Sequence, residues 1–195
     1  MSYLSPLGRR AFAGSVLSIV SVLSAGLTAG QGVLGSGGDK NNSYRTYKDP
    51  AGRFEVDYPS KDWRVLPSGG SNLTTFTHKD GPTLYLEHLR LDDPLTPEEI
   101  GAMPEVEVGR LRELEPKVKD FVSDMAETKA GRGVLIRYTR VDAPESVMQF
   151  SLLVGPQNLY RLRGIVSNKL LPKYEPIIKY MMRSFIATAA STPKS

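Results

Sequence analysis

The chain has 195 residues, of which 25 are basic and 21 acidic, a net charge of +4 at pH 7, and no cysteine. Without cysteine it has no disulfide framework, no thiolate metal site, no cysteine nucleophile and no lipidated cysteine. Two arginines precede a long uncharged run and every acidic residue follows it, so the rest of the chain is nearly neutral. A balanced surface of this kind offers no basic patch to nucleic acid, and we expect no nucleic-acid partner.

The N-terminus is predicted to direct export. Arg9 and Arg10, with Phe12 two positions later, resemble the twin-arginine export motif, and no charged residue follows before Asp39. A short positive stretch ahead of an apolar run is typical of a secretory signal. The run is also long enough to cross a bilayer as a helix, so an uncleaved membrane anchor is the alternative. Either interpretation places the folded part outside the cytoplasm, in a thylakoid lumen or a bacterial periplasm, peripheral to the membrane.

The chain is predicted to hold one folded domain, because composition changes only near the two ends. A stretch rich in Gly, Ser and Asn after the apolar run is typical of a flexible tether. The predicted parts are the export signal or anchor at 1–35, a flexible linker at 36–46, the domain at 47–186 and a disordered tail at 187–195.

Antiparallel strands are expected in the first half of the domain. From residue 54 to residue 58, apolar side chains alternate with charged ones, which is the pattern of a strand with one buried face. Trp63 is expected to anchor the core. An Asp-Gly pair is a strong hairpin signal and separates two β-rich runs. The expected stretches are 54–58, 63–66, 73–77 and 83–91.

A helix is predicted to begin at Thr96. Thr96 and Glu99 have the spacing of a capping box, and Pro97 occupies the first helical position. Apolar residues at helical spacing continue to Leu114. Pro104 interrupts this pattern, so one kinked helix and two consecutive helices fit equally well.

The second half is expected to contain three strands and a closing helix with one apolar face. Alternating basic residues such as Arg161 and Arg163 are interpreted as a solvated face. The predicted fold class is α+β, an antiparallel β-sheet with helices packed on both faces. The expected strands are 133–141, 147–154 and 159–166, and the apolar face of the helix is Tyr174, Ile177, Ile178, Met181 and Phe185.

We expect no enzymatic activity, because only two histidines are available as a base for a nucleophilic triad. His78 precedes the Asp-Gly turn and His88 lies on the following strand. Together with Asp80 they could form a weak Zn²⁺ or Mn²⁺ site, and the alternative is that they are solvated sheet residues. Acidic residues at 92, 93, 98 and 99 leave a Ca²⁺ site open, although capping of the predicted helix also explains them.

The sequence from Tyr47 to Pro59, closed by Asp62 and Trp63, resembles the opening of PsbP-like domains. In that family a Tyr-x-Asp turn with Gly and then Phe leads into an apolar strand, followed by Pro and Trp. The C-terminal part of the domain also resembles this family, and the resemblance covers residues 44 to 186. It implies an α-β-α sandwich around an antiparallel sheet. The matching residues of the far end are Leu159-Tyr160, Arg161 to Gly164, Tyr174 and Ser184-Phe185.

The resemblance also implies a role. Photosynthetic members of the family are lumenal accessory proteins of photosystem II, where the best known member supports retention of calcium and chloride at the oxygen-evolving cluster. Related proteins act in photosystem assembly, and a fungal Ran-binding protein shares the fold. Before Tyr44 the chain lacks the long basic segment of plant PsbP, and a chain without cysteine cannot be the lipoprotein form. A specialised paralogue or bacterial relative is therefore expected.

These observations lead to two hypotheses of function. The first is a non-catalytic accessory or assembly protein that docks on a membrane complex, photosystem II or a related photosynthetic complex. The second is an exported small-ligand or metal-binding module of a non-photosynthetic bacterium. No cofactor is certain from the sequence, and Ca²⁺ and Zn²⁺ are the candidates for the metal-binding version.

Overall fold

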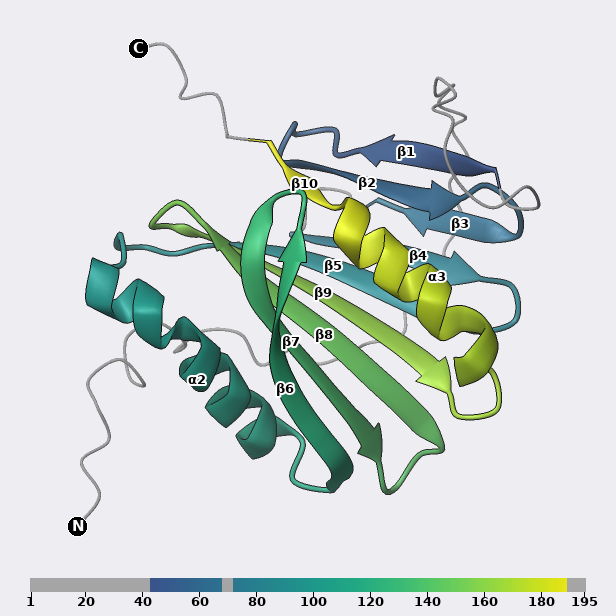
Figure 1. The fold of residues 1–195 in the computed structure, drawn as a ribbon. Coiled ribbons are helices and arrows are strands. Elements are labelled where there is room, and N and C mark those ends of the chain that lie inside the picture. The colour runs from purple at the N-terminus through teal and green to yellow at the C-terminus, as the bar shows by residue number, and fades with distance from the viewer. Residues whose placement is uncertain (1–42, 68–71, 189–195) are drawn as a thin grey trace.

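The computed structural model describes residues 43–67 and 72–188. The predicted export signal with Arg9, Arg10 and Phe12 lies outside these residues. Within them, no helix is long and apolar enough to cross a membrane. The elements, labelled as in Figure 1, are β1 (Tyr44–Lys48), β2 (Phe54–Pro59), β3 (Trp63–Leu66), β4 (Leu73–His78), β5 (Thr83–Arg90), α2 (Pro97–Leu114), β6 (Val118–Thr128), β7 (Gly131–Arg140), β8 (Glu145–Val154), β9 (Asn158–Ser167), α3 (Leu171–Ser184) and β10 (Ile186–Ala187).

A seven-stranded antiparallel sheet forms the centre of the fold, with the strand order β3-β4-β5-β9-β8-β7-β6. The predicted hairpin is confirmed, since Phe76 of β4 pairs with Leu84 of β5 across the Asp-Gly turn. Gly81 in that turn has a φ of 110°, a conformation that favours glycine. The three strands predicted in the second half are also confirmed, as β7, β8 and β9.

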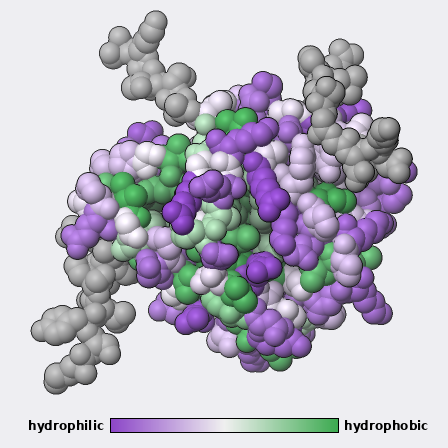
Figure 2. Space-filling model, in the orientation of Figure 1, coloured by the Kyte–Doolittle hydropathy of each residue, from purple (hydrophilic) through white to green (hydrophobic). Residues whose placement is uncertain are grey.

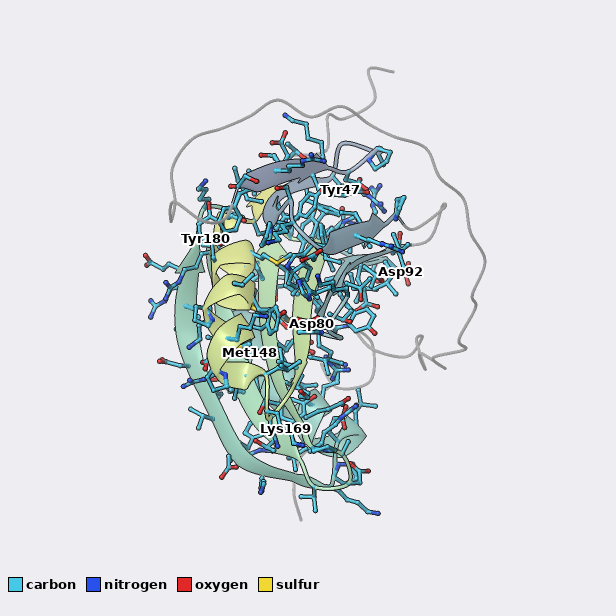
Figure 3. The ribbon with its side chains drawn as sticks, turned by 90° about the vertical axis from the view of Figure 1, so that its right-hand side faces the viewer. Tyr47, Asp80, Asp92, Met148, Lys169 and Tyr180 are labelled. Carbon is cyan, nitrogen blue, oxygen red and sulfur yellow. The ribbon has the colours of Figure 1, made fainter. Side chains whose placement is uncertain are left out.

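Helices α2 and α3 lie on opposite faces of this sheet, as predicted. Figure 3 views the sheet from its edge, with α3 and Tyr180 on one side and Asp92, shortly before α2, on the other. Neighbouring residues of β8 follow this division, because Met148 belongs to the core under α3 and Val147 to the core under α2. The α+β class with helices on both faces is therefore confirmed.

A second, three-stranded sheet has the order β1-β2-β10 and completes the core under α3. Phe54 and Val56 of β2 are each only 1% exposed, which confirms the strand predicted there. At its ends this sheet extends into regions predicted as linker and tail. Tyr44 of β1 packs its ring 4.3 Å from that of Tyr180, and Ala187 of β10 pairs with Phe54.

Trp63 is a core residue, as expected. It begins β3, its side chain is 6% exposed, and its ring lies edge-on to the imidazole of His78 at 5.4 Å. On α3, the predicted apolar face is confirmed for Tyr174, Ile178 and Met181, which are fully buried.

Helix α2 is continuous through Pro104, which decides between the two alternatives left open by the sequence. Thr96 caps it with the complete capping box to Glu99. A proline at position 104 leaves the carbonyl of Ile100 without its helical donor. Because Ile100 is exposed, water can solvate that carbonyl, and the helix continues without a break.

Strand β6 was not expected from the sequence. Its pairing with β7 shifts between Lys119 and Val122, and Asp120 in this bulge has a φ of 54°. An extra residue in one strand transfers the following side chains to the other face, so the alternation of polar and apolar residues is lost. Most of the strand is also exposed, which removes the apolar signal on which a strand prediction depends.

Candidate docking groove and polar clusters

A buried carboxylate lies between α2 and the sheet. Glu107 occupies a position between Met103 and Leu111 on the inner face of α2, and its side chain is fully buried. A helix places residues four apart on the same face, so Glu107 must face the sheet if its two apolar neighbours do. A buried charge requires partners, because its desolvation is costly.

Arg161 of β9 supplies the main partner. Its Nε donates to Glu107 Oε2 at 3.0 Å and its Nη2 donates to Oε1 at 2.8 Å, which is a bidentate ion pair. Arg110, three residues further along α2, also donates to both oxygens. Ser151 and Gln149 of β8 complete the set at 2.8 and 3.2 Å from Oε2.

This cluster, which we call the Glu107 network, fixes α2 to the sheet. Both carboxylate oxygens of Glu107 accept hydrogen bonds from protein donors, and Arg161 also donates to Glu87 at 3.3 Å. Burial acts to raise the pKa of Glu107, but the charges and hydrogen bonds of Arg161 and the charge of Arg110 outweigh it and hold that pKa below its usual value. The carboxylate is therefore ionised at neutral pH, and both of its oxygens are engaged in the contacts between α2 and the sheet.

The Glu107 network corrects one sequence prediction. Arg161 was interpreted as part of a solvated face, and that prediction is wrong because its side chain is 8% exposed and covered by α2. Arg163, two residues further, is only partly exposed and donates to Tyr138 Oη at 3.0 Å. The signal in the sequence was the charged residue Glu107 at an apolar position of a helix, opposite the polar residues Gln149 and Ser151 of a central strand.

A second polar cluster surrounds His78 at the end of β4. Its Nδ1 accepts a hydrogen bond from the backbone N–H of Asp80 at 3.0 Å, and Tyr174 Oη lies 3.1 Å from the same nitrogen. Tyr174 donates to Asp80 Oδ2 at 2.6 Å, and Lys173 donates to the same oxygen at 3.3 Å. This arrangement ties the Asp-Gly turn to the first turn of α3.

Of the three residues predicted as metal ligands, the structure brings two together. His78 Nδ1 lies 3.7 Å from Asp80 Oδ2. His88 sits at the other end of the β4–β5 pair, with its ring stacked on Tyr160 and its Nε2 3.1 Å from Asn158 Oδ1. Among residues 43–67 and 72–188, no group of three or more histidine and acidic side chains is placed to hold a metal ion.

The two histidines make stability sensitive to mild acid. Burial lowers the pKa of His78 and also that of His88, although the Asn158 hydrogen bond opposes the shift at His88. Between the lowered pKa and the unfolded value of about 6.5, the unfolded chain binds more protons than the folded one. We therefore expect the free energy of unfolding to be highest above about pH 6.5 and to fall as the pH drops below it.

Urea unfolding at pH 7.5 and at pH 5.5 would measure this loss. The double variant His78→Asn, His88→Asn serves as the control and should show a smaller difference between the two pH values. Carboxylates whose pKa is lowered, such as Glu107, lose their contribution only as the pH falls below about 4.5, outside this window. An unchanged difference in the double variant would contradict the assignment to the histidines.

The acidic residues considered for Ca²⁺ lie around the start of α2. Glu99 is occupied by the capping box, accepting from the backbone N–H of Thr96 at 2.9 Å. Asp92, Asp93 and Glu98 are exposed. The capping interpretation of Glu99 is thus confirmed.

A groove of about 510 Å³ runs between α2 and the strand pair β6–β7. Val108 and Gly109 line its α2 wall, and Met125 and Val134 line the sheet wall. A Cβ at Gly109 would meet nothing within 4 Å, so the glycine leaves room beside the helix. We call this feature the α2–β6 groove. The groove could not be predicted from the sequence, because most of its sheet wall belongs to the unexpected strand β6.

The rim of the α2–β6 groove carries more acid than base. Glu105 and Asp124 stand on opposite walls, and both are exposed. Arg112 also lines the groove, but its guanidinium lies over the ring of Phe121, 4.8 Å from the ring centre. On the molecular face drawn in Figure 2, hydrophobic side chains occur in separate patches among hydrophilic ones. A docking contact on this molecule would therefore combine apolar and charged groups.

Comparison with known proteins shows the fold. No protein-family profile matches the chain, and no curated protein sequence matches it. Among solved structures, cyanobacterial PsbP from Synechocystis aligns with a TM-score of 0.55 at 13% identity, covering 80% of this chain and 99% of that chain. The chain therefore has a PsbP-like fold.

Two other solved structures align less closely. LpqN of Mycobacterium tuberculosis, described as involved in cell envelope biogenesis, has a TM-score of 0.48 at 12% identity over 77% of this chain and 93% of that chain. The Ran-binding protein Mog1p of Saccharomyces cerevisiae has a TM-score of 0.46 at 9% identity over 77% and 98%.

Proposed function

We propose that this chain is a non-catalytic, extracytoplasmic accessory or assembly protein that docks on a membrane complex, photosystem II or a related photosynthetic complex. The observation that supports the proposal is the alignment with cyanobacterial PsbP, which spans 99% of that protein. The arginine pair near the N-terminus supports the compartment, because it resembles an export signal.

The use of the polar side chains supports a binding role. Glu107, the most deeply buried acid, is held by arginines as a structural ion pair, and His78 is held by a turn and by Tyr174. In the described part of the chain, the α2–β6 groove combines an open apolar wall with charges at its rim. Such a surface suits recognition of another protein.

Native gel electrophoresis of solubilised membranes tests the proposal. A tagged full-length chain, produced in a photosynthetic bacterium that carries it, should co-migrate with a photosystem. Met125→Lys should abolish co-migration by placing a charge in the groove, whereas the matched control Val141→Lys, at an exposed residue directly after β7, should not. Free migration of the unaltered chain would contradict the proposal.

The alternative is an exported small-ligand or metal-binding module, and for a small ligand the α2–β6 groove is large enough. About 510 Å³ lies within the range of small-molecule sites. For a metal, calorimetric titration with Zn²⁺ and Ca²⁺ should give heat that His78→Ala removes. A titration of the unaltered chain without heat would contradict the metal version.

A further inference from the structure

Strand β6 leaves part of its backbone unpaired at the edge of the sheet. It is the last strand in the order, and β7 is its one neighbour among the described strands. The backbone N–H of Met125 is bonded to the side chain of Asp124, at 2.8 Å from Oδ1, and not to β7. Met125 therefore points its N–H away from the sheet.

The β6–β7 register shows which other residues of β6 point their backbone groups away from β7. Thr128 pairs with Gly131 across a two-residue turn, and the residues that flank such a turn form a hydrogen-bonded pair. In an antiparallel edge strand, every second residue bonds to the neighbour and the residues between them point outward. Ser123, Met125 and Glu127 therefore direct N–H and C=O groups outward, and we call this row the β6 edge.

The β6 edge borders the α2–β6 groove. Met125 lies opposite Val134, and Ser123 lies opposite Ile136, in the β6–β7 register. Val134 and Ile136 belong to the core under α2, so Met125 and Ser123 share that face. A strand added to the β6 edge would thus place every second side chain beside α2, near Val108 and in the space that Gly109 leaves open.

Charge indicates which side chains such a strand would carry. Glu105, Asp124 and Glu127 are exposed around the edge and the groove. Of the basic residues nearby, Arg112 lies over the ring of Phe121. Glu127 lies opposite the exposed Arg132 in the β6–β7 register, whereas the Asp124 carboxylate accepts from the backbone N–H of Met125. Lysine or arginine on the added strand beside Asp124 would meet this carboxylate, whereas acidic residues there would be repelled.

The β6 edge is also protected against indiscriminate pairing. The bulge at Asp120 breaks the strand near its start, and the Asp124 carboxylate covers the Met125 N–H. Bulges and charges are devices by which edge strands avoid aggregation. A basic segment can remove this protection, because its lysine would pair with the Asp124 carboxylate as the N–H is released.

We propose that the β6 edge takes up an extended segment of a partner protein by strand addition. The segment alternates apolar residues, which lie over the α2–β6 groove, with lysine or arginine, which point to the other face of the sheet and meet Asp124 there. This inference rests on the proposed function, since it names the kind of segment through which the partner docks. Main-chain hydrogen bonds supply affinity and the alternate side chains supply selectivity.

A synthetic peptide tests the proposal with the full chain. The probe is the fluorescein-labelled heptapeptide Lys-Val-Lys-Val-Lys-Val-Lys, and its anisotropy is measured during titration with protein.

Met125→Pro removes the outward N–H without touching the ladder to β7 and should weaken binding about tenfold. Met125→Val keeps the N–H and also removes the methionine side chain from the groove, so the tenfold loss is expected of Met125→Pro relative to Met125→Val. Asp124→Asn should weaken binding and reduce its dependence on salt.

Hydrogen exchange gives a measurement that needs no variant. Bound peptide should slow exchange of the amides of Ser123, Met125 and Glu127 in the unaltered chain. Equal affinity of Met125→Pro and Met125→Val, equal binding of a Glu-Val heptapeptide, or exchange at these amides unchanged by the peptide would each overturn the inference. So would dimerisation of the chain through β6. Peptide binding by a chain that migrates free of every photosystem would leave this inference standing and refute the proposed function.

Discussion

Replacing Glu107 with alanine is expected to lower the free energy of unfolding by about 3–5 kcal/mol. The substitution would leave the Arg161 guanidinium under α2, 8% exposed, without its bidentate partner. Gln149 and Ser151 would also lose their common acceptor. Removing one member of a buried ion pair is costly mainly because the remaining charge is left uncompensated.

Urea unfolding at pH 7 measures this effect, with Glu113→Ala as the matched control. Glu113 lies on the same helix and is exposed, so its removal should change stability by less than about 0.5 kcal/mol. A loss below about 1 kcal/mol for Glu107→Ala would show that the Glu107 network does not hold α2 as described.

Replacing both partners separates the cost of an orphaned charge from the value of the pair. The double variant Glu107→Met, Arg161→Met should be more stable than Glu107→Ala, because the guanidinium that makes the bidentate pair is no longer buried without Glu107 and the new side chains fill similar space. The two sites touch, so their effects should not add. A double variant less stable than Glu107→Ala would indicate that the pair itself supplies most of the stability.

The sequence predicted the elements whose burial is one-sided. Strand β2 shows aromatic and aliphatic residues at Phe54 and Val56 between charged ones, and its inner residues are buried as the pattern requires. The start of α2 was predictable from Thr96 and Glu99, because capping depends on residues three apart in the chain. Alternation and capping involve residues that are close in the sequence, and they therefore predict individual strands and helix ends.

Features that depend on distant residues could not be predicted in the same way. Glu107 and Arg161 are 54 residues apart, and nothing in the neighbourhood of either specifies the other. His78 and His88 were placed near each other because they lie on one hairpin. The register sets Leu73 opposite Glu87, and this puts the histidines at opposite ends. For β6, one bulge at Asp120 removed the alternation that would have identified the strand and the α2–β6 groove.

Alanine at Gly133 is expected to lower the free energy of unfolding by about 3 kcal/mol, at the upper end of the range for overpacked sites. Gly133 lies in β7, where a Cβ would stand 2.7 Å from the Phe150 ring and still closer to the carbonyl oxygen of Ser151. Phe150 is 1% exposed and cannot swing into solvent, and the carbonyl belongs to the backbone of β8. The strands would have to separate to admit the methyl group.

The same substitution at Gly101 should have the opposite sign. A Cβ there meets nothing within 4 Å, and the residue lies inside α2, where alanine is favoured over glycine by about 0.5–1 kcal/mol. Thermal unfolding followed by circular dichroism should therefore move the midpoint down for Gly133→Ala and up for Gly101→Ala. Equal midpoints for the two variants would mean that β7 and β8 do not approach each other at Gly133 as closely as the structure shows.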